Sequence, residues 1–381
     1  MNTSSSVPDN LSDFPVDTAN AAGVLRIDLA ALRHNYQWLK ESVAAETVCA
    51  VVKADAYGLG APKVVSTLYQ AGCRNFFVAH LDEARVLLPL VPDDASFFVL
   101  NGLAPGSEPA CAATGRVVPV CNSPEQFSTW LAEAERLKRR LSVVLQVDTG
   151  MSRLGFSLDQ LETLAQEGRW KSRLNIRLVM SHLACADEPE HGLNELQLAR
   201  FRSIVSLFPG AAASLSNSAG CLLDNEFHQQ WVRPGIALYG VNPTSVQSDP
   251  FKPVASLHAR VIQVHTVDSE ATIGYGATAT AEKPLRLATI AAGYADGWPR
   301  HLSNRGAAYW QSYRLPIVGR VSMDLTIVDI SALPESALQR GDWVELIGPH
   351  QTVAQVAADA DTIPYEILTQ LGKRYYRYSV G

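Results

Sequence analysis

A regular alternation of short apolar runs with amphipathic segments, which begins at Val24, constrains the fold more than any other feature of this sequence. The apolar runs are continuous and rich in β-branched residues, a pattern typical of parallel strands that are buried on both faces. Eight such runs precede residue 240, at residues 48–53, 75–79, 96–101, 117–121, 142–147, 176–182, 212–216 and 232–238. They predict the strands of an α/β domain with helices between them.

The intervening segments carry the start signals and the spacing of amphipathic helices. Ser123 and Pro124 are a typical N-cap and first helical residue for a helix over residues 126–138. Apolar residues at helical spacing predict further helices over 158–167 and 193–207. Eight strand–helix units in about 225 residues predict a TIM barrel, and a doubly wound parallel sheet is the alternative.

The pattern changes near Pro250, where strand-like runs follow one another without long helices between them. These runs cover residues 254–267, 285–291, 315–321, 325–330 and 343–347, and one short helix is predicted over 353–358. We therefore expect three parts: a disordered leader over 1–23, a TIM barrel over 24–248 and a mostly β domain over 249–381.

Composition excludes several classes of function. Lys and Arg number 32 and Asp and Glu 38, a net charge of −6, which disfavours binding to nucleic acid or to an anionic membrane. Six scattered cysteines form no ligand-like cluster and predict neither a disulfide framework nor a metal site. The leader lacks the apolar core of a signal peptide, so we expect a cytoplasmic protein.

Polar and cationic residues follow several of the predicted strands, at the end where α/β barrels hold their functional groups. They are Lys53, Arg153, His182, Asn217, Ser218, Arg233 and Gly235. Lys53 permits two interpretations, an ordinary solvated strand end or a desolvated amine that forms a Schiff base with a carbonyl cofactor. Ser218 and Gly235 also permit two interpretations, common turn residues or part of the phosphate site that barrels form after their last two strands. A phosphate site beside such a lysine points to pyridoxal phosphate.

Eight ordered motifs then resemble the alanine racemase family. The first, VVKADAYGLG at residues 51–60, is similar to the family's pyridoxal-phosphate attachment motif. The others are VDTGMSRLGF at 147–156, SNSA at 216–219, VRPGIALYG at 232–240, IGYG at 273–276, GYADG at 293–297, GRVSMD at 319–324 and TIPYE at 362–366. The resemblance covers the chain from Val24 to its end. It implies a fold-type III enzyme that interconverts L- and D-alanine, supplying D-alanine for peptidoglycan or supporting alanine catabolism.

By this resemblance, two bases on opposite faces of the substrate Cα carry the proton transfer. Lys53 holds the cofactor as an aldimine and acts as one base, and Tyr275 is the other. His182 and Arg233 form the hydrogen-bonded chain behind Tyr275. Because arginine stays protonated, Arg233 can only donate to the pyridine nitrogen, which leaves the ring a weaker electron sink and favours racemisation over transamination.

The resemblance assigns further positions to cofactor and substrate. Beside Lys53 and Arg233, the implied cofactor contacts are Tyr57, Asn217, Ser218, Gly235, Ile236 and Tyr365. The implied substrate contacts are Arg153, Tyr294, Met323 and Asp324. In the family, the positions of Tyr275, Tyr294, Met323 and Asp324 reach the site from the second subunit, so the resemblance implies a homodimer with shared active sites.

Two positions depart from the family pattern. Gln146 stands where members often carry a carbamylated lysine that orients the active-site arginine, and Ser322 stands where a cysteine is frequent. Glutamine cannot be carbamylated, but its amide oxygen can accept a hydrogen bond from Arg153, so we expect a neutral substitute with a weaker orienting effect.

Two other functions are compatible with the same residues. One is a pyridoxal-phosphate-dependent racemase of other or broader amino-acid specificity. The second is a pyridoxal-phosphate carrier without catalysis, although such proteins resemble the barrel alone, whereas this chain adds a β domain with Tyr275.

Overall fold

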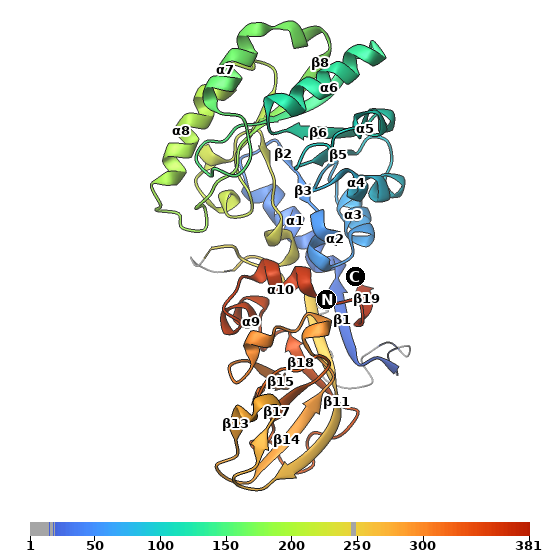
Figure 1. Cartoon of the computed structure of the whole chain (residues 1–381), viewed down its shortest axis with the longest axis vertical. Helices are drawn as coiled ribbons and strands as arrows, with labels where there is room; N and C mark the ends of the chain where they lie inside the picture. Colours follow the sequence, from blue (N-terminus) through green and yellow to red (C-terminus); the bar gives the residue numbers. More distant parts are fainter. Residues whose placement is uncertain (1–14, 16–17, 19, 245–248) are drawn as a thin grey trace. The chain divides into compact units, whose positions relative to one another are not determined.

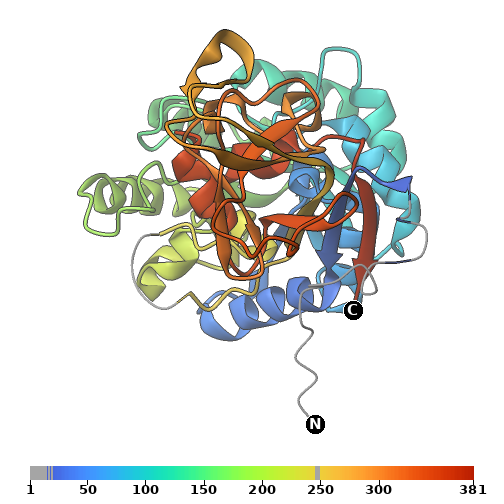
Figure 2. The ribbon, with the colours of Figure 1, turned by 90° about the horizontal axis from the view of Figure 1, so that it is seen from below.

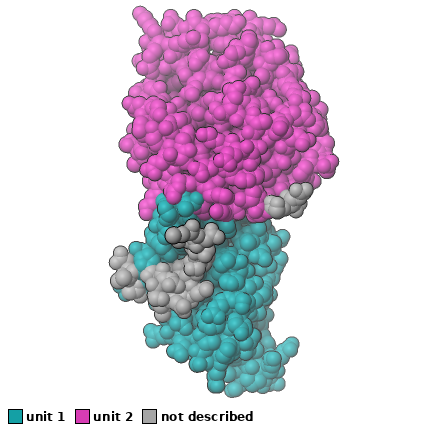
Figure 3. Space-filling view, turned by 180° about the vertical axis from the view of Figure 1, so that it is seen from behind, with its two compact units in different colours: residues 1–30, 253–381 teal, residues 31–252 magenta. Residues whose placement is uncertain are grey.

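The structure is a computed structural model that describes residues 15, 18, 20–244 and 249–381. It divides into two compact units (Figure 3). The barrel unit is Ala31–Lys252, and the β unit combines Met1–Ala30 with Pro253–Gly381. The predicted disordered leader falls on residues that lie, for the most part, outside the described ones.

Parallel strands form the core of the barrel unit (Figure 1). One sheet holds seven strands in chain order: β3 (Ala50–Val51), β4 (Asn75–Val78), β5 (Ser96–Val99), β6 (Val117–Cys121), β7 (Leu141–Gln146), β8 (Leu174–Met180) and β9 (Ala212–Ser214). Their side chains are almost all buried, which explains why the sequence shows continuous apolar runs instead of alternation.

Backbone hydrogen bonds close this sheet into a ring. β10 (Trp231–Val232) pairs in parallel with β2 (Thr47–Val48). The Cys49 N–H donates to the Val232 carbonyl at 2.9 Å, and the Arg233 N–H donates to the Ser216 carbonyl at 3.0 Å, next to β9. Because both edges of the sheet are joined through β10, the α/β barrel is confirmed and the doubly wound alternative is excluded.

The eighth predicted strand is shorter than expected. Residues 232–238 were predicted as one strand, but β10 ends at Val232 and a 3₁₀ turn, η7, occupies Ile236–Tyr239. Pro234 has no N–H to donate to a neighbouring strand, and Gly235 turns the chain at φ −123° and ψ −86°. The apolar residues of this segment are buried in the turn and not in a strand.

Helices connect the barrel strands and cover them. They are α1 (Leu29–Ser42), α2 (Lys53–Gly58), α3 (Ala61–Gln70), α4 (Leu81–Leu87), α5 (Glu108–Thr114), α6 (Pro124–Leu137), α7 (Leu158–Glu167) and α8 (Leu193–Val205). Ser123 Oγ accepts the Gln126 N–H at 3.3 Å, as expected for the N-cap of α6. The helices predicted over 126–138, 158–167 and 193–207 are confirmed by α6, α7 and α8.

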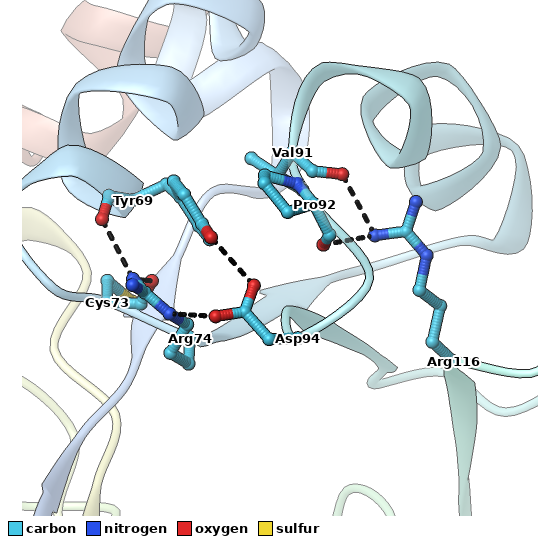
Figure 4. A network of polar contacts seen from close by, with 7 residues as sticks. All are labelled: Tyr69, Cys73, Arg74, Val91, Pro92, Asp94 and Arg116. Carbon is cyan, nitrogen blue, oxygen red and sulfur yellow. Dashed lines mark hydrogen bonds and ion pairs between the residues drawn. The ribbon is translucent and has the colours of Figure 1, made fainter.

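Two arginines fix the amino-terminal ends of the barrel strands (Figure 4). Arg74, just before β4, forms an ion pair with Asp94 at 2.7 Å, and Tyr69 donates its hydroxyl hydrogen to the same carboxylate at 2.7 Å. Arg116, just before β6, donates to the Val91 and Pro92 carbonyls. These contacts tie loops to strands at the end of the barrel opposite Lys53, so their role is structural.

The β unit is built on one large sheet with the order β16-β15-β18-β11-β1-β19, in which β14 pairs with β11 and β17. Its strands are β1 (Gly23–Asp28), β11 (Ala255–Val267), β14 (Leu285–Ile290), β15 (Ala307–Trp310), β16 (Tyr313–Pro316), β17 (Thr326–Asp329), β18 (Trp343–Ile347) and β19 (Tyr376–Val380). A small ribbon joins β12 (Thr272–Ile273) to β13 (Ala279–Thr280). The mostly β character is confirmed.

The N-terminal strand joins this sheet. β1 pairs antiparallel with β11 and parallel with β19, and Figure 2 shows β1 and β19 side by side. The sequence pattern predicts a barrel domain that begins at residue 24, whereas residues 23–28 pair with strands of the β unit. α9 (Val353–Asp359) confirms the short helix predicted over 353–358, and a second helix that the sequence pattern did not predict, α10 (Pro364–Gln370), follows it. Among the described residues, no helix is long and apolar enough to cross a membrane.

Candidate active site

Lys53 lies just after β3 and begins a left-handed turn. Residues 54–57 all have φ between 53° and 57°, so the chain of α2 winds left-handed there. This conformation costs about 1–2 kcal/mol per non-glycine residue. Strain of this kind persists only where surrounding contacts hold it, and it gathers at functional sites. The strand end that carries Lys53 is therefore a candidate active site.

Charged neighbours and burial act on Lys53 and on His182. Burial, and then the charge of Arg153, lowers the pKa of Lys53, while the Glu83 carboxylate acts in the opposite direction. Burial and the charges of Arg233, Arg153 and Lys53 lower the pKa of His182 to about 3. His182 is thus neutral at physiological pH, and the site as a whole favours an anionic ligand.

Arg233 is a buried cation that donates to neutral oxygen atoms. Its guanidinium donates to Ser214 Oγ, to the Ser181 carbonyl at 2.5 Å and to the Leu215 carbonyl at 3.4 Å. Its exposed fraction is 3%, and burial lowers its pKa to about 10. The guanidinium therefore stays protonated near neutral pH and can act only as a donor.

The ring of His182 contacts Asn217. The distance from His182 Nε2 to Asn217 Nδ2 is 3.4 Å, and Asn217 Oδ1 accepts the Gly220 N–H at 3.0 Å. Within the part of the chain that the structure describes, no hydrogen bond joins His182 to Arg233; their interaction is electrostatic. The predicted hydrogen-bonded chain through these two residues stays a prediction.

Ser218, Gly235 and Tyr57 meet beside the Lys53 turn. Ser218 is buried, and its Oγ accepts the Gly235 N–H at 2.7 Å and the Ala237 N–H at 3.3 Å. A Cβ on Gly235 would lie 2.2 Å from the Tyr57 hydroxyl oxygen. The Tyr57 ring packs on Tyr239 with ring centroids 4.7 Å apart. Hydroxyl groups and backbone N–H groups converge here, which is the donor set that binds phosphate.

The loop that carries Arg153 folds around Asp148. Asp148 Oδ1 accepts backbone N–H groups from three residues, 150 to 152, at 2.9–3.1 Å. Gln146 is buried, and its Nε2 donates to the Leu154 carbonyl at 3.1 Å. The Gln146 amide therefore bonds to the backbone next to Arg153. The family resemblance instead predicts a hydrogen bond from the Arg153 guanidinium to this amide.

The remaining predicted residues lie in the β unit. Tyr275, Tyr294 and Met323 are exposed, with Tyr275 at 72%, although each is large and apolar. The Tyr294 N–H donates to the Ser322 carbonyl at 3.0 Å, which joins two of the motif loops. Tyr365 lies in the first turn of α10 and is 38% exposed.

Arg374 holds these loops together. Its Nη1 forms an ion pair with Asp324 at 2.7 Å, and its Nε forms one with the buried Asp296 at 2.6 Å. Asp296 in turn accepts the Gly293 N–H at 3.0 Å. Sequence reasoning missed Arg374, since it lies outside every motif quoted above.

The barrel-unit residues fit pyridoxal phosphate. The cofactor needs an amine for its aldehyde, a pocket of hydroxyl and N–H donors for its phosphate, and a polar group for its ring nitrogen. Lys53, the Ser218–Gly235–Tyr57 cluster and Arg233 are of these kinds. The close approach of the Tyr57 hydroxyl to Gly235, which a Cβ at that position would block, supports the phosphate position in particular.

Known families match both halves of the chain. A family model described as the N-terminal domain of alanine racemase matches residues 27–243, and one described as the C-terminal domain matches residues 254–379. The chain belongs to the alanine racemase family. It is thus a pyridoxal-phosphate-dependent isomerase that interconverts L- and D-alanine, as expected. A carrier that resembles the barrel alone does not account for the C-terminal match.

Individual relatives extend over nearly the whole chain. A catabolic alanine racemase of Agrobacterium fabrum is 54% identical over 357 residues, which cover 94% of this chain and 92% of the relative. The crystal structure of the Bartonella henselae alanine racemase has covalently bound pyridoxal phosphate, a TM-score of 0.91 and 42% identity, and covers 94% of this chain and 100% of that one. The biosynthetic alanine racemase of Pseudomonas aeruginosa has a TM-score of 0.89 and 38% identity, covering 95% and 100%.

The Gly235→Ala change is expected to weaken cofactor binding about tenfold or more, because overlap of this size costs about 1–3 kcal/mol. The new methyl group would displace the Tyr57 hydroxyl from the cluster. Titration of the apo protein with pyridoxal phosphate measures the effect. Gly192→Ala is the matched control, since nothing lies within 4 Å of a Cβ at that position. Equal dissociation constants for the two variants would contradict the phosphate site.

Proposed function

We propose that alanine racemisation in this protein uses Lys53 and Tyr275 as two bases on opposite faces of the substrate Cα. The observation that carries the proposal is the position of Lys53, whose pKa is lowered, on a strained turn beside the Ser218–Gly235–Tyr57 cluster. When bound, pyridoxal phosphate supplies a conjugated ring that makes the Cα hydrogen of the amino acid acidic.

Lys53 takes up and returns the proton on its own side of the substrate. A base must be neutral to accept a proton, and the lowered pKa keeps a larger share of the Lys53 amine neutral near pH 7. Arg153 contributes to this shift. In the proposed role, its exposed guanidinium also binds the substrate carboxylate together with Met323, Tyr294 and Asp324.

Arg233 and His182 set the electrostatics of the site. Arg233 remains protonated, so in the proposed position it donates to the ring nitrogen and keeps that nitrogen from gaining a proton. By holding a bound ring in this state, Arg233 would weaken it as an electron sink and so favour rapid reprotonation at Cα over transamination. His182 stays neutral, so its ring can accept a hydrogen bond from the protonated Tyr275 hydroxyl or, in its other tautomer, donate one to the deprotonated Tyr275 oxygen.

Tyr57, Asn217, Ser218, Gly235, Ile236 and Tyr365 are the proposed cofactor contacts. The Gly235 and Ile236 segment contributes backbone N–H groups at the start of η7, and Ser218 and Tyr57 contribute hydroxyl groups. Asn217 reaches the site through its contact with His182.

A homodimer would complete each active site. The β unit exposes three large side chains that carry much apolar surface, Tyr275, Tyr294 and Met323. Such exposure is unusual unless a partner covers these side chains. In the proposed dimer, Tyr275 of the partner subunit faces Lys53. Arg374 keeps Asp324 and the loop of Tyr294 in one arrangement for that contact.

We place the enzyme in the cytoplasm, where D-alanine is made for peptidoglycan or L- and D-alanine are used as nutrients. The six cysteines are free, as is usual in a reducing compartment. The 54% identical relative is named catabolic, which favours a role in alanine use. Deletion of the gene from its host separates these roles, because a strain that then requires D-alanine for growth would identify the biosynthetic role.

Chiral analysis of the product from each L-amino acid tests the activity and its specificity. Alanine is expected to turn over fastest; faster turnover of lysine or arginine would overturn the assignment in favour of a broad-specificity racemase. Borohydride reduction of the holoenzyme followed by peptide mapping tests the attachment point. An adduct at a lysine other than Lys53 would overturn the mechanism.

A further inference from the structure

The two carboxylate oxygens of Glu83 connect the ends of two neighbouring strands. Glu83 lies in the first turn of α4, directly after β4. Its Oε1 accepts the Ala54 N–H at 2.7 Å, and its Oε2 accepts the Ala79 N–H at 2.7 Å and the His80 N–H at 3.1 Å. Ala54 directly follows Lys53. The carboxylate thus spans the gap between the Lys53 turn and the end of β4.

This bridge begins where the backbone ladder ends. β3 and β4 pair in parallel through Val51 and Phe77, and the last backbone bond is from the Val52 N–H to the Phe77 carbonyl at 2.8 Å. Beyond Lys53 the chain turns left-handed and can no longer pair with β4. There the Glu83 carboxylate connects the turn to the end of β4, because it accepts the first N–H of that turn.

The left-handed turn needs such a holder. Residues 54–57 are Ala, Asp, Ala and Tyr, none of which has the conformational freedom of glycine. Two backbone bonds also hold the turn, from the Ala56 N–H to the Val52 carbonyl and from the Gly60 N–H to the Asp55 carbonyl, both at 2.9 Å. Beyond the turn, Asp55 Oδ1 accepts the Ala61 N–H at 2.7 Å. At the end next to Lys53, the side-chain contact is the one to Glu83.

We propose that Glu83 is a positioning residue for Lys53, which holds the left-handed turn so that the lysine side chain leaves the strand end in a fixed direction. This inference rests on the proposed role of Lys53 as the point of cofactor attachment. Glu83 also acts by charge. It is the carboxylate that raises the pKa of Lys53 against the effects of burial and Arg153, so it limits how far that pKa falls.

The Glu83→Gln variant removes both effects at little change of volume. An amide presents one acceptor and one donor group, so it can satisfy Ala54 or the Ala79 and His80 pair, but not both. Asp82→Asn is the matched control. Asp82 is the preceding residue of the same helix, its side chain is 91% exposed, and its ion pair, at 3.7 Å, is with Arg85. Both variants lose one negative charge.

Two measurements on the purified protein distinguish the positioning effect of Glu83 from the effect of its charge on Lys53. Titration of the apo protein gives the dissociation constant for pyridoxal phosphate. The absorbance of the protein with bound pyridoxal phosphate, recorded over a range of pH, gives the pH midpoint, at which covalent attachment is half complete. Glu83→Gln is expected to weaken binding about tenfold through the lost charged hydrogen bonds. Its midpoint is expected to fall by roughly one pH unit, because the carboxylate no longer stabilises the protonated amine. Asp82→Asn is expected to behave as the parent chain in both measurements.

A Glu83→Gln variant that matches Asp82→Asn in both measurements would overturn the inference. If Glu83→Gln does not fold, as judged by thermal unfolding of the apo protein, Glu83→Asp decides. Its shorter side chain keeps the charge but loses reach, so binding should weaken while the pH midpoint stays near that of the parent; parental affinity would overturn the positioning role. The borohydride adduct of the parent chain is a separate test, because its absence from Lys53 would refute the proposed function itself.

Discussion

Replacement of Lys53 by alanine is expected to lower the rate of alanine racemisation about 10⁴-fold or more, since it removes both the attachment point and one of the two bases. The strained turn, the lowered pKa and the neighbouring Ser218–Gly235–Tyr57 cluster all centre on this residue. Racemisation in both directions, followed with purified Lys53→Ala, measures the loss, and mass analysis after borohydride reduction checks that no adduct forms.

Lys63→Ala is the control for this experiment. Lys63 lies ten residues further along, exposed on α3, so its removal changes the net charge equally without touching the strand end. Its activity should equal that of the parent chain. Substantial racemisation by Lys53→Ala, with an adduct mapped to another lysine, would remove the main support for the two-base assignment.

The barrel could be predicted from the sequence because its strands are buried on both faces. Continuous apolar runs then mark each strand, and runs such as residues 117–121 coincide with the observed strand. β1 could not be placed in the same way. Its pairing partners, β11 and β19, lie at the other end of the chain, and no local pattern in residues 23–28 indicates which sheet they join.

The last predicted strand illustrates a second limit. Residues 232–238 are apolar enough for a strand, but Pro234 and Gly235 interrupt the backbone pairing and redirect the chain into η7. Pro234 and Gly235 are turn signals, but the apolar character of the run favours a strand. Hydrophobicity indicates that a segment is buried and does not indicate which kind of element it forms.

Some residues of the candidate site could be predicted from the sequence and others could not. Residue types with obvious chemistry, such as Lys53 and Arg233, stand out at strand ends. Residues that act through contacts formed on folding do not. Glu83 accepts the backbone N–H next to Lys53, and Arg374 forms ion pairs with Asp296 and Asp324 in the β unit. The helix start at His80 and Glu83 has the spacing of a capping box, which is the one signal that could have drawn attention to Glu83.

Gln146 shows how a departure from the family pattern is accommodated. The family resemblance led us to expect an amide that accepts a bond from Arg153. In the structure the amide nitrogen donates to the Leu154 carbonyl, so it supports the loop that carries Arg153. A neutral side chain can fix the backbone in this way, but it supplies no charge to the guanidinium.

Replacement of Tyr275 by phenylalanine is expected to lower racemisation about 10²–10⁴-fold, the usual contribution of a general acid or base. The side chain is 72% exposed in the single chain, so loss of its hydroxyl should not disturb the fold of the β unit. Exchange of the Cα hydrogen with solvent deuterium should be retained for the enantiomer whose proton faces Lys53 and lost for the other. An equal loss for both enantiomers would contradict separate bases on the two faces.

Mixing the two inactive variants tests whether Tyr275 acts across a subunit boundary. In a heterodimer of Lys53→Ala and Tyr275→Phe chains, shared sites would give one site with both defects and one site with neither. Random exchange of equal amounts should then restore about a quarter of the parental sites, since half of the dimers are mixed and each has one intact site. If Tyr275 instead served Lys53 of its own chain, every site would keep one defect. Absence of recovery, with mixed dimers detected by mass, would therefore contradict the shared active site while leaving the role of Lys53 intact.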